Sequence, residues 1–128
     1  MPRKVIASEK APRAIGPYSP AIGTPHYVYT SGQIGLAPAT RVLISGGIEA
    51  ETRQALSNIS TLLEEAGTSL AAVVKTTVFL RDMADFDRMN AVYAEFFTEE
   101  PPARTTVAVA ALPRGAAVEI DAVAYLGG

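Results

Sequence analysis

The sequence of 128 residues contains no cysteine and one histidine, His26. The lack of cysteine excludes disulfides, thiolate metal sites and cysteine nucleophiles. A lone histidine argues against a histidine-rich metal site and against a histidine-based catalytic triad within one chain. His26 lies in a loop between Pro25 and Tyr27, where we expect a surface residue. No metal site is therefore predicted.

Positive charge is also scarce. Eleven basic and 13 acidic side chains give a formal charge of −2, whereas nucleic-acid binding needs clustered positive charge. No stretch approaches the roughly 18 apolar residues of a membrane-spanning helix, and residues 1–6 contain no apolar run of signal-peptide length. We therefore expect a cytoplasmic protein that binds neither nucleic acid nor membrane.

The composition is that of an ordinary globular domain, with 48% hydrophobic and 19% charged residues. No internal repeat, low-complexity tract or linker-like change in composition divides the chain. A chain of this length buries roughly two-thirds of its unfolded surface, which is enough for a core. We predict a single domain over residues 1–128.

Residues 49–66 show the periodicity of a helix, because their apolar residues recur at spacings of three and four. Gly67 follows where a left-handed C-terminal cap belongs. The Ser-Gly-Gly sequence at 45–47 lacks the lysine and the glycine spacing of phosphate-binding loops. A plain loop is therefore favoured there over an anion site at the helix start.

A second helix is predicted around the apolar stripe of residues 86–97. Asp82 or Asp85 can cap its start, and the Pro-Pro pair at 101–102 ends it. Asp82, Asp85 and Asp87 lie close together but show no EF-hand pattern. We interpret them as acidic residues favoured at a helix N-terminus, and the aromatic residues of the stripe as core packing.

Strands are predicted over four segments rich in β-branched residues: 27–31, 73–80, 104–110 and 117–125. Their order around the helices implies an α+β fold, with two helices packed on one face of a mixed sheet. In the last strand, alternation separates two sets: Val118, Ile120, Ala122 and Ala124 toward the helices, and Glu119, Asp121, Val123 and Tyr125 away from them. The outward face is more apolar than a solvated sheet surface, so we expect another subunit to cover it.

Arg104 begins a strand that we expect to be largely buried, where an arginine needs an anionic partner. One interpretation, which composition alone favours, is a structural ion pair with Glu119 or Asp121 of the next strand. The other is an anchor for a substrate carboxylate, since the guanidinium fork matches a carboxylate in bidentate fashion.

Four blocks along the chain resemble the signatures of one family. They are APRAIGPYS at 11–19, TSGQIG at 30–35, VKTTVFLRDM at 74–83, and PAR, LP and VEI at 102–104, 112–113 and 118–120. In this order, and spanning nearly the whole chain, they are similar to the RidA (YjgF) family of reactive enamine/imine deaminases.

The resemblance implies a chorismate-mutase-like α+β fold assembled as a homotrimer, with three sites in the clefts between subunits. It also implies a reaction without a cofactor, the hydrolysis of 2-aminoacrylate and related 2-imino acids to 2-keto acids and ammonia. An imine carbon is already electrophilic, so a protein needs only to orient the carboxylate, place a water and support proton transfer. On this resemblance Arg104 holds the substrate carboxylate and Glu119 positions or activates the water. The residues that line the pocket are Tyr18, Ser31, Gly32, Asn90 and Thr106.

The chain departs from the family pattern at four positions. Thr106 stands where cysteine is common, Pro20 where glutamine is, Ala108 where glutamate is and Arg41 where glycine is. These departures leave the preferred substrate size open. The alternative function is a non-catalytic trimer that binds small carboxylates in the same cleft. The presence of Glu119 as well as the anion anchor Arg104 favours the enzyme, because a protein that only binds carboxylates does not need a second carboxylate there. The net charge does not favour ribonuclease activity.

Overall fold

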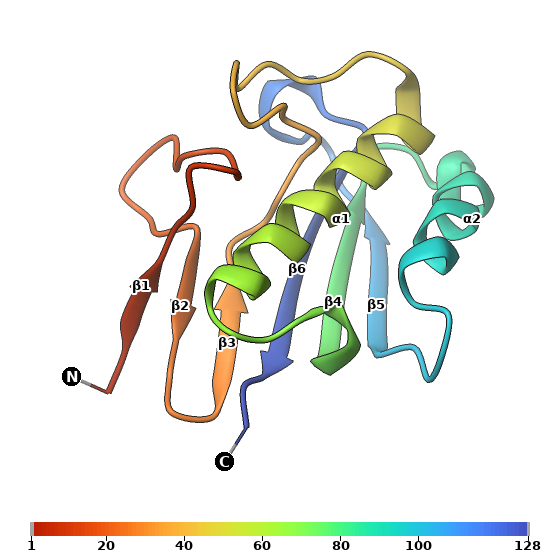
Figure 1. Cartoon of the computed structure of the whole chain (residues 1–128). Coiled ribbons are helices and arrows are strands. Elements are labelled where there is room, and N and C mark those ends of the chain that lie inside the picture. The colour runs from red at the N-terminus through yellow and green to blue at the C-terminus, as the bar shows by residue number, and fades with distance from the viewer. Residues whose placement is uncertain (1, 128) are drawn as a thin grey trace.

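The computed structural model describes residues 2–127. One six-stranded sheet forms a layer, and two helices cover one of its faces (Figure 1). The strands are β1 (Lys4–Ile6), β2 (Ala21–Gly23), β3 (Tyr27–Thr30), β4 (Val73–Leu80), β5 (Ala103–Ala108) and β6 (Val118–Tyr125). The helices are α1 (Gly47–Glu65) and α2 (Phe86–Phe96), with short 3-10 turns η1 (Leu70–Ala72), η2 (Met83–Asp85) and η3 (Pro113–Gly115).

The spatial order of the strands is β1-β2-β3-β6-β4-β5. β4 and β5 are parallel and are connected through α2, whereas the other neighbouring pairs are antiparallel. The last strand of the chain, β6, therefore lies inside the sheet between β3 and β4. This arrangement confirms the predicted mixed α+β sheet with two helices.

The core lies between α1 and the inner face of the sheet. The periodic apolar residues of α1 are fully buried, among them Leu56, Ile59, Leu62 and Leu63. The inward set of β6 is at most 2% exposed, as alternation predicts: Val118, Ile120, Ala122 and Ala124. Glu119 and Asp121 consequently lie on the outer face.

The helix ends coincide with capping residues and not with the prolines that follow in the sequence. Gly67 has a φ of 93°, which confirms the predicted left-handed residue after α1. The Asp82 carboxylate accepts a hydrogen bond from the Ala84 N–H at 2.9 Å and so caps the turn that leads into α2. The prediction that the Pro-Pro pair ends this helix is wrong: α2 ends at Phe96. Phe97 follows with non-helical φ and ψ of −128° and 71°, and its buried ring lies 4.6 Å from that of Tyr93.

The sequence predicts neither β1 nor β2. Each has three residues, and β2 lies in a stretch rich in proline and glycine that favours turns. The expectation that the strand of Arg104 is largely buried is also wrong, because β5 is the edge of the sheet and most of its residues are half-buried or exposed.

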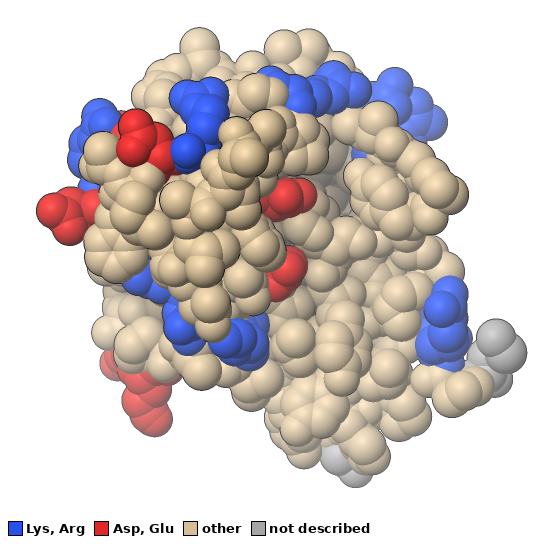
Figure 2. All heavy atoms as spheres, turned by 180° about the vertical axis from the view of Figure 1, so that it is seen from behind, with Lys and Arg blue, Asp and Glu red and all other residues tan. Residues whose placement is uncertain are grey.

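The outer face of the sheet is mostly uncharged in the view from behind (Figure 2). Tyr29, Val107 and Tyr125 expose 48%, 39% and 45% of their surface there. An apolar face of this kind normally packs against something, and the homotrimer stays a prediction. No helix among residues 2–127 has the length and apolar character needed to cross a membrane.

Candidate functional site

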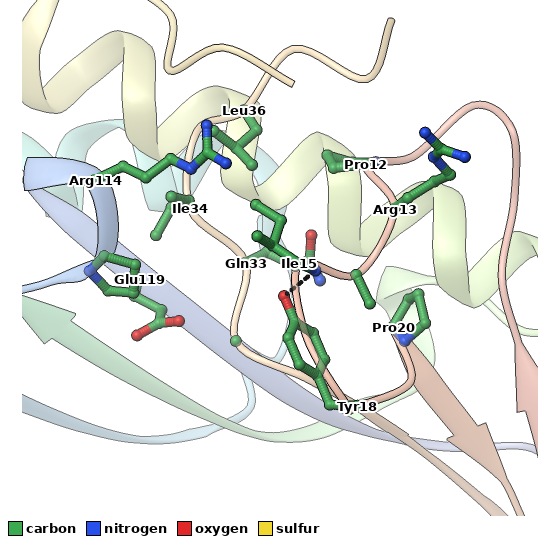
Figure 3. A pocket seen from close by; sticks show the side chains of 13 residues that line it. Pro12, Arg13, Ile15, Tyr18, Pro20, Gln33, Ile34, Leu36, Arg114 and Glu119 are labelled. Carbon is green, nitrogen blue, oxygen red and sulfur yellow. Dashed lines mark hydrogen bonds between the residues drawn. The ribbon is translucent and has the colours of Figure 1, made fainter. Parts of the chain in front are cut away.

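A cavity of about 310 Å³ opens beside the start of β6, at the end of β3 (Figure 3). Three segments form its walls, residues 12–20, residues 32–36 and residues 113–119. Of the predicted site residues, the cavity brings together Tyr18, Gly32 and Glu119. Its other walls are largely apolar, with Ile15, Ile34, Leu36 and Pro113 among the lining residues.

Gly32 and Glu119 lie close together in the cavity wall. An isolated bridge pairs Gln33 with Ile120 through two backbone hydrogen bonds of 2.8 and 3.0 Å, which sets the segment after β3 beside β6. A Cβ placed on Gly32 would lie 2.5 Å from Oε2 of Glu119. Glycine is therefore the residue that leaves room for the carboxylate in this position.

The Glu119 carboxyl is half-buried, and this burial raises its pKa above the usual value for glutamate. The negative charge of Asp121, two residues along on the same face, raises the pKa further. Both effects disfavour the ionised form. The pKa of Glu119 therefore shifts toward neutral pH, where a carboxyl group serves best as a general acid or base.

Tyr18 faces Glu119 across the cavity (Figure 3). Its hydroxyl accepts a hydrogen bond from the Ile15 N–H at 3.1 Å. The Ser31 hydroxyl donates to the Ser19 carbonyl at 2.5 Å, and the Ser31 N–H donates to the Pro20 carbonyl at 2.8 Å. Ser31 thus ties the segment that carries Tyr18 to the end of β3, and its hydroxyl already has a partner within the chain.

Arg104 lies away from this cavity. It pairs in register with Thr76 of β4, whose side chain is fully buried on the helix side of the sheet. Its guanidinium carbon lies 4.7 Å from the ring centre of Tyr93 and 5.6 Å from that of Phe86, both on α2. Stacking on two aromatic faces stabilises a cation without neutralising it.

The predicted alternative of an ion pair between Arg104 and Glu119 or Asp121 of the same chain is wrong. β4 separates β5 from β6, and both acidic residues lie on the outer face while Arg104 lies on the inner one. Among residues 2–127 the ion pairs are Arg53–Glu95 and Arg88–Asp85, so the charge of Arg104 is not neutralised by a described carboxylate.

Asn90 and Thr106 belong to the group around Arg104. Asn90 follows Phe86 by four residues on α2 and precedes Tyr93 by three, so these three share one side of the helix. Its Oδ1 is buried and has no hydrogen-bond partner among the described residues. Thr106 lies two residues after Arg104, on the same face of β5, beside Val78. One chain therefore holds the predicted residues in two separate groups.

Sequence reasoning missed several residues of both groups. Phe86 and Tyr93 were indicated by their spacing around Asn90, which places all three on one side of a helix, but that pattern is also typical of a core. Arg114 and Pro12 line the cavity. Nothing in the sequence indicates their position, because it depends on how distant loops pack.

Comparisons with known proteins identify the family of the chain. A family model described as Endoribonuclease L-PSP matches residues 8–126. The 2-iminobutanoate/2-iminopropanoate deaminase of Mus musculus is 50% identical over 125 residues, which cover 98% of this chain and 93% of that protein. The chain belongs to the RidA (YjgF) family.

Solved structures of this RidA family superpose closely on the chain. The YjgF gene product of Escherichia coli has a TM-score of 0.91 at 42% identity, over 95% of this chain and 98% of that one. Escherichia coli TdcF, solved with bound serine, also has a TM-score of 0.91, at 37% identity and with the same coverage.

Proposed function

We propose that the chain is a hydrolase that deaminates reactive enamines and imines of small 2-amino acids, such as 2-aminoacrylate, to 2-keto acids and ammonia. The observation that carries the proposal is the half-buried Glu119 carboxylate beside Gly32, with a raised pKa, in a mostly apolar cavity. The mouse relative is a deaminase of this type by name. The serine bound to TdcF is close in size to the proposed substrates.

The reaction adds water to a C=N bond. An enamine such as 2-aminoacrylate first tautomerises to its imine, which reacts in the protonated form. Glu119 accepts a proton from the attacking water as the water oxygen bonds to the imine carbon and the C=N π pair moves to nitrogen, which gives a carbinolamine. The proton on Glu119 then moves to the nitrogen, the C–N bond breaks and ammonia leaves, and the hydroxyl proton returns to Glu119 as the C=O bond forms. General acid–base help of this kind is typically worth about 10²–10⁴-fold in rate.

Arg104 is proposed to hold the substrate carboxylate. Its guanidinium is oriented by Phe86 and Tyr93 and has no carboxylate partner in the described chain, which suits an anion from outside. Because Arg104 and Glu119 lie on opposite faces of the sheet, a site that uses both needs two subunits. We therefore propose a homotrimer in which the edge strand β5 of one subunit faces the cavity of the next. The apolar outer face supports such an assembly.

The endoribonuclease of the family description is not favoured for this chain. A formal charge of −2 and a single exposed histidine provide neither a basic track nor a histidine acid–base pair.

The test is the release of ammonia and keto acid from imines generated in the assay by an amino-acid oxidase. The protein should accelerate release from small imino acids, and Glu119→Gln should lower kcat about 10²–10⁴-fold while a keto acid still binds by calorimetry. Sedimentation equilibrium should give about three times the chain mass of 13.4 kDa. Keto-acid binding without any acceleration would identify a binding protein, and a monomer would exclude the shared site.

A further inference from the structure

α1 carries three buried polar side chains, Glu51, Thr52 and Asn58, and two of them, Glu51 and Asn58, form hydrogen bonds to backbone groups outside the helix. Glu51 is 6% exposed and Asn58 is 1% exposed. They are seven residues apart, which is two helical turns, so both lie on the same side of the helix. Burying a carboxylate or an amide costs free energy unless its polar atoms find partners. The hydrogen-bond partners of Glu51 and Asn58 therefore indicate which segments these two side chains hold in place.

Glu51 holds one wall of the cavity. Its Oε1 accepts a hydrogen bond from the buried Ala117 N–H at 2.8 Å. Ala117 lies directly before β6 and two residues before Glu119, and the same stretch contains the Pro113 and Arg114 side of the cavity. The start of the strand that carries the reactive carboxylate is thus fastened to α1.

Asn58 holds the facing wall. Its Nδ2 donates to the Leu36 carbonyl at 3.0 Å and to the Ile34 carbonyl at 3.4 Å. Its Oδ1 accepts a hydrogen bond from the side-chain amide of Gln54 at 2.9 Å, which fixes the orientation of the amide. Gly35, between the two carbonyls, lies so close that a Cβ there would come within 2.9 Å of the Glu51 Cα. The segment that begins with Gly32 is thus fastened to the same helix.

The two walls meet where Gly32 lies against Glu119, and a Cβ on residue 32 would clash with the carboxylate. We infer that Glu51 and Asn58 are positioning residues, which use the rigid helix α1 to fix the distance between Gly32 and the reactive carboxylate. This inference rests on the proposed function. It assigns to α1 a part in the reaction although neither side chain lines the cavity.

The test replaces the hydrogen-bonding atoms and keeps the size of the side chains. Glu51→Met removes the acceptor for Ala117, whereas Glu51→Gln keeps an oxygen in its place. Since a displacement of about 1 Å costs on the order of 100-fold, we expect Glu51→Met to lower kcat by about 10- to 100-fold. The keto-acid Kd should change less than about twofold, because Arg104 is untouched. Glu51→Gln should restore kcat to within about threefold of the wild type.

Asn58→Leu tests the other wall independently and serves if Glu51→Met does not fold. It should likewise lower kcat with little change in keto-acid affinity. The matched control is Leu63→Ala on the same helix, whose side chain is fully buried in the core. It should lower Tm at least as much as the two variants do, while kcat well below Tm stays within about twofold of the wild type.

The inference is overturned if both Glu51→Met and Asn58→Leu keep kcat and lose only Tm, or if Glu51→Gln is as impaired as Glu51→Met. Failure of the proposed function has a different signature, because the wild type would then release no ammonia. In that case the titration of Glu119, followed by NMR of its carboxyl carbon, supplies the readout. Glu51→Met and Asn58→Leu should move that titration, and Glu51→Gln and Leu63→Ala should not; an unmoved titration in both test variants overturns the inference.

Discussion

Gly32→Ala adds one methyl group in the cavity wall, against the side chain of Glu119. The new Cβ would lie 2.5 Å from Oε2 and 2.7 Å from Cδ of Glu119. The backbone of Gly32 is outside the left-handed region, so alanine adopts its conformation without strain. The perturbation therefore acts through the Glu119 side chain and not through the backbone.

The size of the effect follows from these distances. To restore an ordinary contact of 3.4 Å, Oε2 must retreat by about 0.9 Å. The end of a glutamate side chain moves this far by rotation, so we expect a loss of stability below about 1 kcal/mol. A displacement of about 1 Å at a reacting group costs on the order of 100-fold in rate, or about 2.7 kcal/mol of transition-state stabilisation.

The assay is the steady-state release of keto acid by Gly32→Ala, with its Tm and its keto-acid Kd measured on the same preparation. We expect kcat to fall about 100-fold while Tm and Kd stay near the wild-type values. In a Glu119→Gln background the same substitution should have little further effect on kcat, because the displaced group no longer reacts. A Gly32→Ala variant with wild-type kcat would refute the assignment of the reactive carboxylate to this contact.

Four further predictions concern individual side chains. Arg104→Lys keeps the charge but loses the fork, so kcat/KM should fall roughly 30- to 3,000-fold with little change in Tm; an active variant, or one that merely unfolds earlier, would contradict the anchor. Because burial and Asp121 raise the pKa of Glu119, the acid limb of kcat/KM should lie above the usual glutamate value, and Asp121→Asn should shift the limb to lower pH. For the same reason, the contribution of Glu119 to stability is full at low pH and is lost as pH rises through the raised pKa, so Glu119→Gln should flatten this decline in urea titrations. Thr52→Val removes a buried hydroxyl that has no hydrogen-bond partner among residues 2–127 and should raise the free energy of unfolding by about 1 kcal/mol; a less stable variant would show that the hydroxyl has a partner in solution.

Periodicity predicts the parts of this fold that depend on one segment at a time. The stripe of α1 and the alternation of β6 need only the local rule that buried positions recur with the period of the element. That rule places Ile120 inside and Glu119 outside, and so gives the face on which Glu119 lies. The same periodicity ends at residue 66, so it predicts Gly67 as the residue that caps α1.

Strand order is the part that local patterns do not contain. β5 directly precedes β6 in the chain, which suggests that they are neighbours in the sheet. Instead β6 pairs with β3 on one side and with β4 on the other, so β4 lies between β5 and β6. The position of Arg104 over Tyr93 follows from this order and from the crossover through α2. The short strand β2 is a second feature that local patterns do not predict. Its three residues form a strand only because the neighbouring strands β1 and β3 provide hydrogen bonds.

The separation of Arg104 and Glu119 within one chain leads to a prediction about mixed assemblies. Arg104→Lys and Glu119→Gln should each be nearly inactive alone. If each site takes Arg104 from one subunit and Glu119 from the next, an equal mixture that exchanges subunits at random should contain both intact groups at about a quarter of its sites. Dissociating and reassembling the two variants together should therefore recover about a quarter of the wild-type kcat per subunit. Native mass spectrometry verifies that mixed trimers have formed. Mixed trimers without recovered activity would show that the two residues do not act at one shared site.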